Sequence, residues 1–389
     1  MGRQKLIRFC KARKRKACCC GRRGGKLLFF GEMVICLLCL FIQLEKEKAR
    51  LKPFFQFDTE ESKKSLLSRA RNAALTALRQ YDLDWNCIRF LQLSDTVTFK
   101  IETESASSYL LRLHSEKMNK DEIMSELIFL SALRNIEGVR VPAGVQSRNG
   151  SYVWECETEP GYRSPCVSLM TWVEGEHASG DFTDRQVCSM GAMMGKLHEA
   201  SARFVAPHHF VRPHWGSQSF RNHTRKLERY YPRFLTSTAW SLYRAAMEKI
   251  ERQLESLPRT ERNYGLIHAD LHSGNIVFND DQPSPIDFGR CGYGYFLYDM
   301  AGALLGLSPR HRQLLIQGYE SVRSLDGDYA AQLEGFFIMF MIENYCHHCS
   351  DPEEIPNLIS EQKYAQAYIN EYLSDQSFLF KKVQPLEKE

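Results

Sequence analysis

The spacing of apolar residues divides this chain into a part that contains strands and a later part that is mostly helical, and that division limits the possible architecture more than any other feature. Three segments alternate or run apolar with β-branched and aromatic residues, and polar turns separate them: Ile88–Leu93, Val97–Thr103 and Tyr109–His114. This pattern predicts antiparallel strands. Beyond Gly175 the spacing becomes helical, in Arg185–Ala202, Ser219–Leu257, Pro309–Arg323 and Tyr329–Cys346. The order predicts an α+β fold with a small antiparallel-sheet lobe followed by a larger helical lobe.

Two helices are predicted around the strands. Apolar residues recur at helical spacing from Leu66 to Tyr81, which predicts an amphipathic helix. Asn119 followed by Glu122 forms a capping pair at the start of a second helix, whose buried stripe is Ile123, Leu127, Leu130 and Leu133. Two further strand candidates follow it, Tyr152–Cys156 and Val167–Trp172.

Length and composition are those of a globular protein with more than one lobe. The chain has 389 residues, 43% hydrophobic and 25% charged, with a net charge of +4. The basic residues between Arg3 and Lys26 account for the excess, so no nucleic-acid partner is expected. The predicted organisation is a basic, Cys-rich extension (1–51), a small lobe that contains the antiparallel sheet (52–173), a helical lobe (174–380) and a tail (381–389).

The cysteines do not form a disulfide framework. Six of the 13 lie between Cys10 and Cys39 and the others are scattered, as in a reduced cytoplasmic protein. The run from Cys346 to Cys349 contains four possible metal ligands, but four consecutive side chains cannot surround one ion tetrahedrally. We interpret this run as the end of a helix.

The N-terminal extension allows two interpretations. Its uninterrupted apolar part, Met33–Ile42, is shorter than the roughly 20 residues that cross a bilayer as a helix. A basic, acylated membrane anchor using Cys18–Cys20 is one interpretation. The other, which we prefer, is an upstream extension that contributes nothing to the fold, with synthesis beginning at Met33.

A polar cluster between two short apolar segments carries the chemistry. In Leu266–Phe278, His268 and Asp270 precede Asn275, and Asp287 then opens the sequence Asp-Phe-Gly. Phosphoryl transfer needs a carboxylate that orients the acceptor and oxygen ligands for Mg²⁺, and this order matches the spacing of kinase catalytic and metal loops. Asp270 and Asn275 could instead cap a turn while Asp287 ends a strand. The combination with flanking apolar strands favours the phosphotransferase interpretation.

These motifs resemble the aminoglycoside phosphotransferase/choline kinase superfamily of protein-kinase-like fold, in the branch with bacterial stress-response kinases and homoserine-kinase-like enzymes. The resemblance covers roughly Leu66 to Cys346 and includes the segment Gly294–Ala301. It implies an ATP- and Mg²⁺-dependent transfer to a hydroxyl group. Asp270 would be the catalytic base, Asn275 and Asp287 would hold Mg²⁺, and His268 and Asp299 would support the catalytic loop.

The same resemblance assigns roles in the small lobe. Arg112 stands where the phosphate-gripping basic residue is expected, and a guanidinium can hold phosphate oxygens bidentately. Glu126 is its expected ion-pair partner, with Glu122 as the alternative. Trp172 and Val173 would contact adenine through their main chains, although Trp172 could equally be a packing residue. In place of a glycine-rich loop, the phosphates would meet Ser94, Asp95 and Thr96.

Three questions stay open at this point. Arg290, just after the metal aspartate, either forms a local salt bridge or contacts phosphate. The acceptor is a small metabolite, an antibiotic or protein Ser or Thr. Glu343 is the one acid on the aromatic helix Phe336–Cys346, whose rings we expect in the core.

The alternative function is a nucleotide-binding protein of this fold with weak or no turnover. The short run from Asp287 to Asp299 leaves no room for a phosphorylated activation segment.

Overall fold

The computed structural model describes residues 27–30, 33–36, 51–178 and 181–387. It divides into two compact units, Met1–Ala73 with Glu157–Pro165, and Ala74–Cys156 with Cys166–Glu389. The boundaries expected at residues 51 and 173 divide the chain differently and stay predictions. None of the helices in the described ranges has the length and apolar character of a membrane span.

The described residues of the first unit include two short strands and part of one helix. Strands β1 (Leu27–Phe30) and β2 (Met33–Cys36) form an antiparallel pair, and the unit holds the first part of α3 (Glu60–Leu78). The Arg69 guanidinium is buried, donates to the Phe54 carbonyl at 2.7 Å and lies 3.9 Å from the centre of the Tyr162 ring. The basic cluster of residues 1–26 lies outside the described residues.

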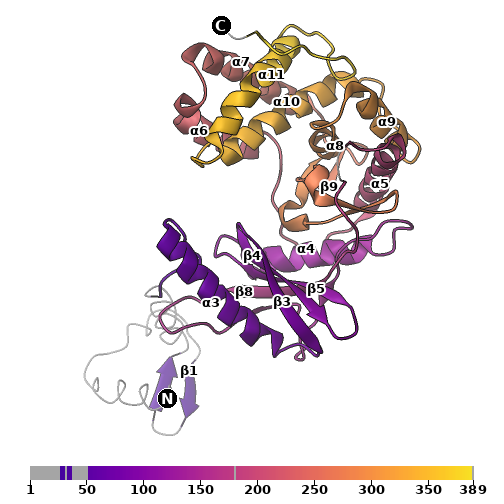
Figure 1. Cartoon of the computed structure of the whole chain (residues 1–389). Coiled ribbons are helices and arrows are strands. Elements are labelled where there is room, and N and C mark those ends of the chain that lie inside the picture. Colours follow the sequence, from indigo (N-terminus) through magenta and orange to yellow (C-terminus); the bar gives the residue numbers. More distant parts are fainter. Residues whose placement is uncertain (1–26, 31–32, 37–50, 179–180, 388–389) are drawn as a thin grey trace. The chain divides into compact units, whose positions relative to one another are not determined.

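An antiparallel sheet forms the first part of the second unit (Figure 1). Strands β3 (Trp85–Leu93), β4 (Thr96–Thr103) and β5 (Ser108–His114) are joined in sequence, and β8 (Cys166–Thr171) pairs with β5. The short strands β6 (Gly144–Val145) and β7 (Val153–Glu155) both pair with β8. The predicted strands are therefore confirmed, with shifts of up to three residues at their ends.

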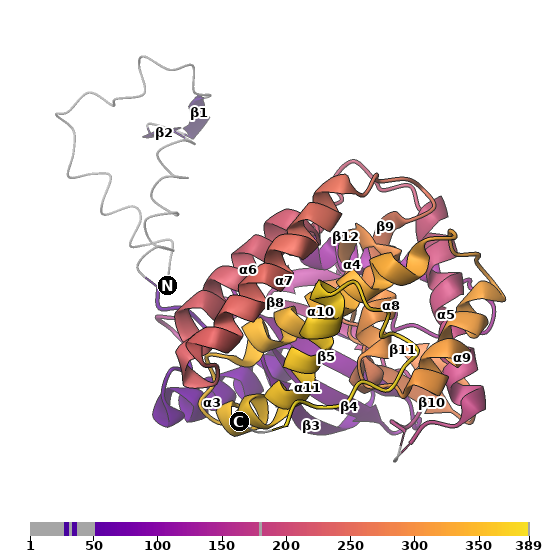
Figure 2. The same cartoon turned by 90° about the horizontal axis from the view of Figure 1, so that it is seen from above.

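Helix α4 (Lys120–Leu133) lies between this sheet and the helical region (Figures 1 and 2). The predicted capping box is present, because the Asn119 side chain accepts from the Glu122 amide at 2.8 Å while the Glu122 carboxylate accepts from the Asn119 amide at 2.9 Å. The predicted stripe on α4 is buried. This cap fixes the helix start one turn before Glu126.

The helical region contains α5 (Asp184–Arg203), α6 (Ser217–Tyr230), α7 (Ser237–Ser256), α8 (Phe296–Leu304), α9 (Pro309–Glu320), α10 (Tyr329–His348) and α11 (Ile355–Leu373). The range Ser219–Leu257, predicted to be helical, contains two helices, α6 and α7. A 3₁₀ turn containing Pro232 interrupts it, and the Thr236 hydroxyl caps α7 by accepting from the Ala239 amide at 3.2 Å. Proline disrupts a helix interior because it lacks the amide hydrogen.

Close packing of α5 against α9 explains one glycine in each helix. A Cβ at Gly191 would lie 1.9 Å from the Leu315 carbonyl oxygen of α9, and one at Gly318 would lie 2.0 Å from the Cys188 carbonyl oxygen. Neither position can accept a side chain.

Four short strands hold the two polar loops. Strands β9 (Tyr264–Ile267) and β12 (Gly292–Tyr295) pair antiparallel, and β10 (Ile276–Asn279) forms a hairpin with β11 (Gln282–Pro285). The Asp270 loop connects β9 to β10, and the Asp287 loop connects β11 to β12. Both loops therefore leave the ends of paired strands, which limits where their side chains lie.

The link from the sheet to the helical region is tied to β10. The Glu176 amide donates to the Phe278 carbonyl at 2.9 Å, and the Phe278 amide returns a 2.8 Å bond. Gly175 approaches so closely, at φ +150°, that a Cβ there would lie 2.8 Å from the Phe278 carbonyl oxygen. The link after Trp172 and Val173 is thus fixed to the strand that follows the Asp270 loop.

Candidate active site

Asp299 of α8 binds the main chain of the loop that carries Asp270. One Asp299 oxygen accepts from the His268 amide and the other from the Ala269 amide, both at 2.7 Å. Ala269 has a positive φ of 63°, an unfavourable conformation for a residue with a Cβ. The two charge-assisted hydrogen bonds stabilise this conformation and so set the direction in which Asp270 leaves the loop.

Two histidines complete this support. His198 of α5 contacts Asp299 through Nε2 at 3.3 Å and the Tyr319 hydroxyl through Nδ1 at 3.0 Å. Burial lowers the pKa of His198, although the Asp299 carboxylate opposes that shift. His268 is buried, and its Nε2 donates to the Ile286 carbonyl at 2.8 Å, one residue before Asp287. His268 therefore connects the Asp270 loop to the Asp287 loop.

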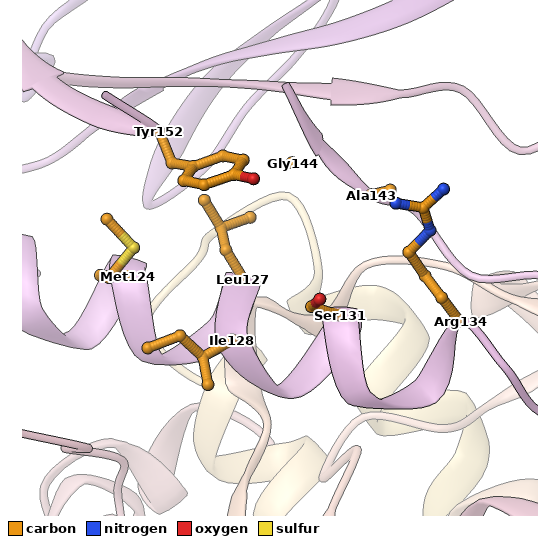
Figure 3. A pocket seen from close by; sticks show the side chains of 8 residues that line it. All are labelled: Met124, Leu127, Ile128, Ser131, Arg134, Ala143, Gly144 and Tyr152. Carbon is orange, nitrogen blue, oxygen red and sulfur yellow. The ribbon is translucent and has the colours of Figure 1, made fainter. Parts of the chain in front are cut away.

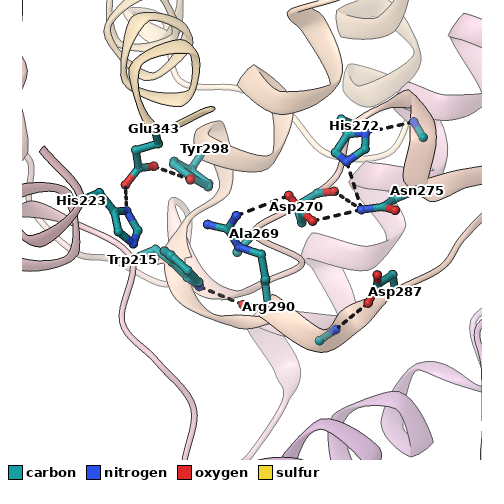
Figure 4. A network of polar contacts seen from close by, with 12 residues as sticks. Trp215, His223, Ala269, Asp270, His272, Asn275, Asp287, Arg290, Tyr298 and Glu343 are labelled. Carbon is teal, nitrogen blue, oxygen red and sulfur yellow. Dashed lines mark hydrogen bonds and ion pairs between the residues drawn. The ribbon is translucent and has the colours of Figure 1, made fainter. Parts of the chain in front are cut away.

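Asp270 and Asn275 contact each other directly. The Asn275 amide nitrogen donates to the main-chain oxygen of Asp270 at 2.9 Å and to its carboxylate at 3.2 Å (Figure 4). This use of Nδ2 leaves the amide oxygen of Asn275 without a hydrogen bond among the described residues. An amide oxygen beside a carboxylate has the donor chemistry that Mg²⁺ prefers.

The Asp287 side chain points away from the core because the side chain of the next residue, Phe288, points inward. Its main chain is left-handed, with φ 60° and ψ 65°, and its carboxylate is exposed, with a 3.4 Å contact to the Gly289 amide. The Phe288 ring is buried, 6.3 Å from the Phe129 ring of α4 and 4.4 Å from the His268 ring. Burial of Phe288 therefore fixes the turn that exposes Asp287.

Arg112 of β5 and Glu126 of α4 form a buried ion pair. Arg112 Nη1 lies 2.8 Å from Glu126 Oε1, with side chains 4% and 0% exposed. Burial disfavours the charged guanidinium, but the carboxylates of Glu126 and Asp287 outweigh it and raise the pKa of Arg112. The structure thus joins Glu126 to Arg112, whereas Glu122, the alternative partner, is occupied by the cap of α4.

The same arginine has unused donors. Within the part of the chain that the structure describes, Arg112 Nε and Nη2 are buried without a hydrogen-bond partner. Buried donors are normally satisfied, so these two atoms fit an anionic ligand.

The other expected nucleotide contacts are less well supported. Ser94 and Asp95 form a two-residue turn between β3 and β4, and the Asp95 carboxylate is paired with Lys117 at 2.7 Å. The Trp172 amide donates to the Ser108 carbonyl at 3.0 Å and its ring lies 4.7 Å from Lys100 Nζ. That amide is therefore engaged within the sheet. The roles of Ser94, Asp95, Thr96, Trp172 and Val173 stay predictions.

Arg290 lies beside Asp270, a placement that the sequence left open. Its Nη1 is 3.7 Å from Asp270 Oδ1, and its guanidinium lies 4.7 Å from the centre of the Trp215 ring. The side chains of Arg290 and Asp270 are 37% and 26% exposed. A long, partly hydrated ion pair is weak, so it leaves the Asp270 carboxylate accessible.

A second polar network adjoins this pair on the helical side (Figure 4). The Glu343 carboxylate of α10 accepts from the Tyr298 hydroxyl at 2.5 Å and contacts His223 Nδ1 at 2.7 Å.

The aromatic residues of α10 named in the sequence analysis are buried, which confirms their core role. The run Cys346–Cys349 ends α10, as predicted. Sequence inspection missed Trp215 and His223, which no motif marks, and gave no role to Tyr298 within the segment Gly294–Ala301.

One cavity lies away from these groups. It has a volume of about 150 Å³ and is lined by α4, β6 and their surroundings: Met124, Leu127, Ile128, Ser131, Arg134, Ala143, Gly144 and Tyr152 (Figure 3). None of the motif residues lines it. It has one charged lining residue and no carboxylate, so it is not a site for phosphoryl transfer.

No cluster of three or more His, Cys, Asp or Glu side chains suited to a metal occurs among the described residues. A Mg²⁺ site of a phosphotransferase needs no such cluster, because one or two protein oxygens complete a shell made of phosphate oxygens and water. The exposed carboxylate of Asp287 and the free amide oxygen of Asn275 fit that requirement.

Comparison with known proteins identifies the family and the fold. Residues 88–332 match the family model APH, described as a phosphotransferase enzyme family. A homoserine kinase from Mesorhizobium japonicum is 25% identical over 264 residues, which cover 61% of this chain and 73% of that protein.

Two solved structures have the same fold. One is a microcompartment-associated aminopropanol kinase, with TM-score 0.68 and 26% identity over 79% of this chain and 99% of that one. The other is the amicoumacin kinase hAmiN in complex with AMP-PNP, Ca²⁺ and Ami, with TM-score 0.67 and 18% identity over 82% of this chain and 98% of that one. The expected bilobal kinase-like fold is confirmed.

Proposed function

The chain belongs to the APH phosphotransferase enzyme family, and from this premise we propose that it transfers the γ-phosphoryl group of ATP, with Mg²⁺, to a hydroxyl group of a small molecule. The proposal is supported by the direct contact of Asp270 with Asn275, on a loop that His268 binds to the residue before Asp287, and by the unused donors of the buried Arg112. A carboxylate base, two oxygen ligands and a buried cation are the parts that phosphoryl transfer requires.

Arg112 would bind the nucleotide phosphates. Its free Nε and Nη2 donors can each bind a phosphate oxygen, while Glu126 holds the guanidinium through Nη1. The complex of amicoumacin kinase with AMP-PNP shows that a relative of this fold binds an ATP analogue. The ordered ion pair lets Arg112 bind phosphate without first being reoriented.

Asp287 and Asn275 would hold Mg²⁺, which would neutralise charge on the transferring phosphoryl group. The left-handed turn at Asp287 keeps its carboxylate exposed, and the bond from Asn275 Nδ2 to Asp270 keeps the amide oxygen free. Asn275 would therefore orient Asp270 with one end of its amide and face the metal with the other.

Asp270 would orient the acceptor hydroxyl and receive its proton. The hydroxyl oxygen forms a bond to the γ-phosphorus, the bond from that phosphorus to the β,γ-bridging oxygen breaks, and ADP leaves with the electron pair. Asp299 and His268 would act through the loop main chain, because their contacts go to the amides of His268 and Ala269 and to the Ile286 carbonyl.

The acceptor would be a small amino alcohol or hydroxylated amino acid. The names of the relatives support this class, since aminopropanol and homoserine both carry an amine and a hydroxyl. The groups near Asp270 also suit a small acceptor, because the Glu343 carboxylate is already bound by Tyr298 and His223. A polycationic acceptor would need further free carboxylates.

The test is a coupled assay of ADP release with Mg-ATP and a panel of acceptors. The panel contains amino alcohols, hydroxylated amino acids, aminoglycosides and a Ser/Thr peptide mixture. We expect ADP release above the rate with ATP alone for at least one small amino alcohol or hydroxylated amino acid. Nucleotide binding without transfer to any acceptor would favour the alternative of a protein that binds nucleotide without turnover.

A further inference from the structure

A segment that no motif marked connects two parts of the active site. Residues Val211–Trp215, here called the bridging segment, lie between α5 and α6 and contact both α4 and the loop after Asp287. Helix α4 carries Glu126, and the loop carries the metal aspartate. The bridging segment is therefore placed to relate the positions of these two elements.

On the side of the Asp287 loop, the bridging segment binds three consecutive carbonyls. Arg212 donates through Nη2 to Gly289 at 2.7 Å and through Nε to Cys291 at 2.5 Å. The Trp215 indole donates to the carbonyl between them, that of Arg290, at 3.0 Å (Figure 4). Main-chain bonds between Pro213 or Trp215 and Tyr293 continue this contact at 2.8 and 2.7 Å.

On the side of α4, the contacts lie in the turn before Glu126. Arg212 Nη1 donates to the Glu122 carbonyl at 3.0 Å, and the Val211 amide donates to the Ser125 hydroxyl at 2.8 Å. Ser125 is buried, and its hydroxyl also donates to the Asp121 carbonyl at 2.7 Å. One guanidinium therefore binds the helix that positions Arg112 and the loop that follows Asp287.

Arg212 is an unusual charge for a buried site. Its side chain is 5% exposed, and no carboxylate forms an ion pair with it among the described residues. A buried cation is costly unless its donors are satisfied, and here carbonyl oxygens alone satisfy it. A planar fork of fixed donors can reach three carbonyls on two elements, whereas the point charge of lysine cannot.

We propose that Arg212 is a positioning residue that couples the phosphate-binding pair Arg112–Glu126 to the metal aspartate, so that both assume their nucleotide-binding arrangement together. This inference rests on the proposed function, because it concerns the Mg²⁺-nucleotide site. It predicts that Mg²⁺ raises the affinity for nucleotide by a smaller factor when Arg212 is lost. The affinity for nucleotide without metal should change less.

The chain offers a matched control. Arg312 is also buried, at 2% exposure, and donates to the carbonyls of Leu304 and Leu379, each at 3.2 Å, and to the Tyr368 hydroxyl at 3.1 Å. None of these partners belongs to the active site. Arg312→Gln should therefore reproduce the loss of stability from removing a buried arginine without changing the nucleotide site.

The experiment measures the affinity of the full chain for AMP-PNP with and without Mg²⁺ by calorimetry, and the ratio of the two affinities is the metal gain. We expect Arg212→Gln and Arg212→Lys each to lower the metal gain about tenfold, the size of typical coupling between groups in one network. Ser125→Ala, which removes one contact to α4, should lower it less. Arg312→Gln should lower the melting temperature and leave the gain unchanged.

A second measurement addresses the coupling itself. In the native background Glu126→Gln should lower the metal gain, whereas in the Arg212→Gln background it should no longer do so. An unchanged metal gain in folded Arg212→Lys or Arg212→Gln would overturn the inference. If both Arg212 variants fail to fold, the Ser125→Ala result decides, and an unchanged gain there would overturn it too.

Failure of the inference is distinct from failure of the proposed function. If the native chain binds AMP-PNP with a metal gain that Arg212 does not influence, only the positioning role is wrong. If the native chain shows no metal-dependent nucleotide binding, the proposed function is wrong and the positioning role falls with it.

Discussion

Replacement of Glu126 by Gln should destabilise the protein strongly, because it removes the partner of a buried charge. Arg112 and Glu126 are 4% and 0% exposed and lie 2.8 Å apart. Loss of one member of such a pair leaves an uncompensated charge in the interior and typically costs about 3–5 kcal/mol. At about 2 °C per kcal/mol for a domain of this size class, the melting temperature should fall by about 6–10 °C.

Removal of both charges should be far less harmful. Arg112→Met combined with Glu126→Leu leaves no buried ion, and buried pairs replaced by apolar residues are often neutral in stability. Arg112 Nε and Nη2 have no hydrogen-bond partners among the described residues. Removing these two atoms in the double variant therefore leaves no acceptor without its donor. The double variant should melt within a few degrees of the native chain, about 2–3 °C, yet bind ATP poorly.

Differential scanning fluorimetry with and without Mg-ATP is the assay. Nucleotide should raise the melting temperature of Glu126→Gln, because phosphate can neutralise the unpaired Arg112, and should have little effect on the double variant. A single variant as stable as the native chain, or a double variant less stable than the single one, would refute the reasoning from the buried pair.

Three further predictions follow from the same contacts. A chain beginning at Lys52 should be soluble and bind ATP like the full chain, since every motif lies beyond it; loss of folding or of affinity in that chain would make residues 1–51 integral. Arg112→Ala should weaken Mg-ATP binding more than Glu126→Ala does in calorimetric titration, and unchanged affinity would show that β5 has been assigned the wrong role. Burial and Arg112 hold the pKa of His114 well below the usual 6.5. Below pH 6.5 the His114 side chain therefore binds more protons in the unfolded chain than in the folded one. As the pH is lowered from 6.5, this group should lower the free energy of unfolding by up to about 1.4 kcal/mol per pH unit. His114→Gln should flatten the decline in melting temperature between pH 6.5 and 5, and an equal slope in both proteins would exclude His114 as its source.

The parts of the fold that depend on neighbouring residues could be predicted from the sequence. Strand alternation in β4 and β5 and the capping box at Asn119 and Glu122 are local patterns, and the structure contains them. The order of Asp270, Asn275 and Asp287 marked the loops for the same reason. The helical character of Ser219–Leu257 was predicted, but apolar spacing alone did not reveal the interruption around Pro232 that divides it into two helices.

The remaining site residues could not be predicted, because their contacts join distant parts of the chain. Arg212 binds carbonyls 77 to 90 positions away, and backbone carbonyls leave no trace in residue identity. Glu343 was singled out for its charge, but its contact with His223 lies 120 positions away. Arg290 could be either a salt-bridge or a phosphate residue until its distance to Asp270 was known.

The central claim, that Asp270 is the base of a phosphotransferase, is tested most directly by comparing Asp270→Asn with Asp287→Asn in one acceptor assay, with ATP affinity measured in parallel. Asp270→Asn should bind Mg-ATP nearly as the native chain does and lose orders of magnitude in turnover. The reason is that the native Asp270 carboxylate would act on the acceptor proton and not on the nucleotide. Asp287→Asn should lose both turnover and metal-dependent nucleotide affinity, with partial recovery at high Mg²⁺. Both variants must keep the native circular dichroism spectrum. If folded Asp270→Asn retains most of the transfer activity, the proposed mechanism is wrong even though the fold is right.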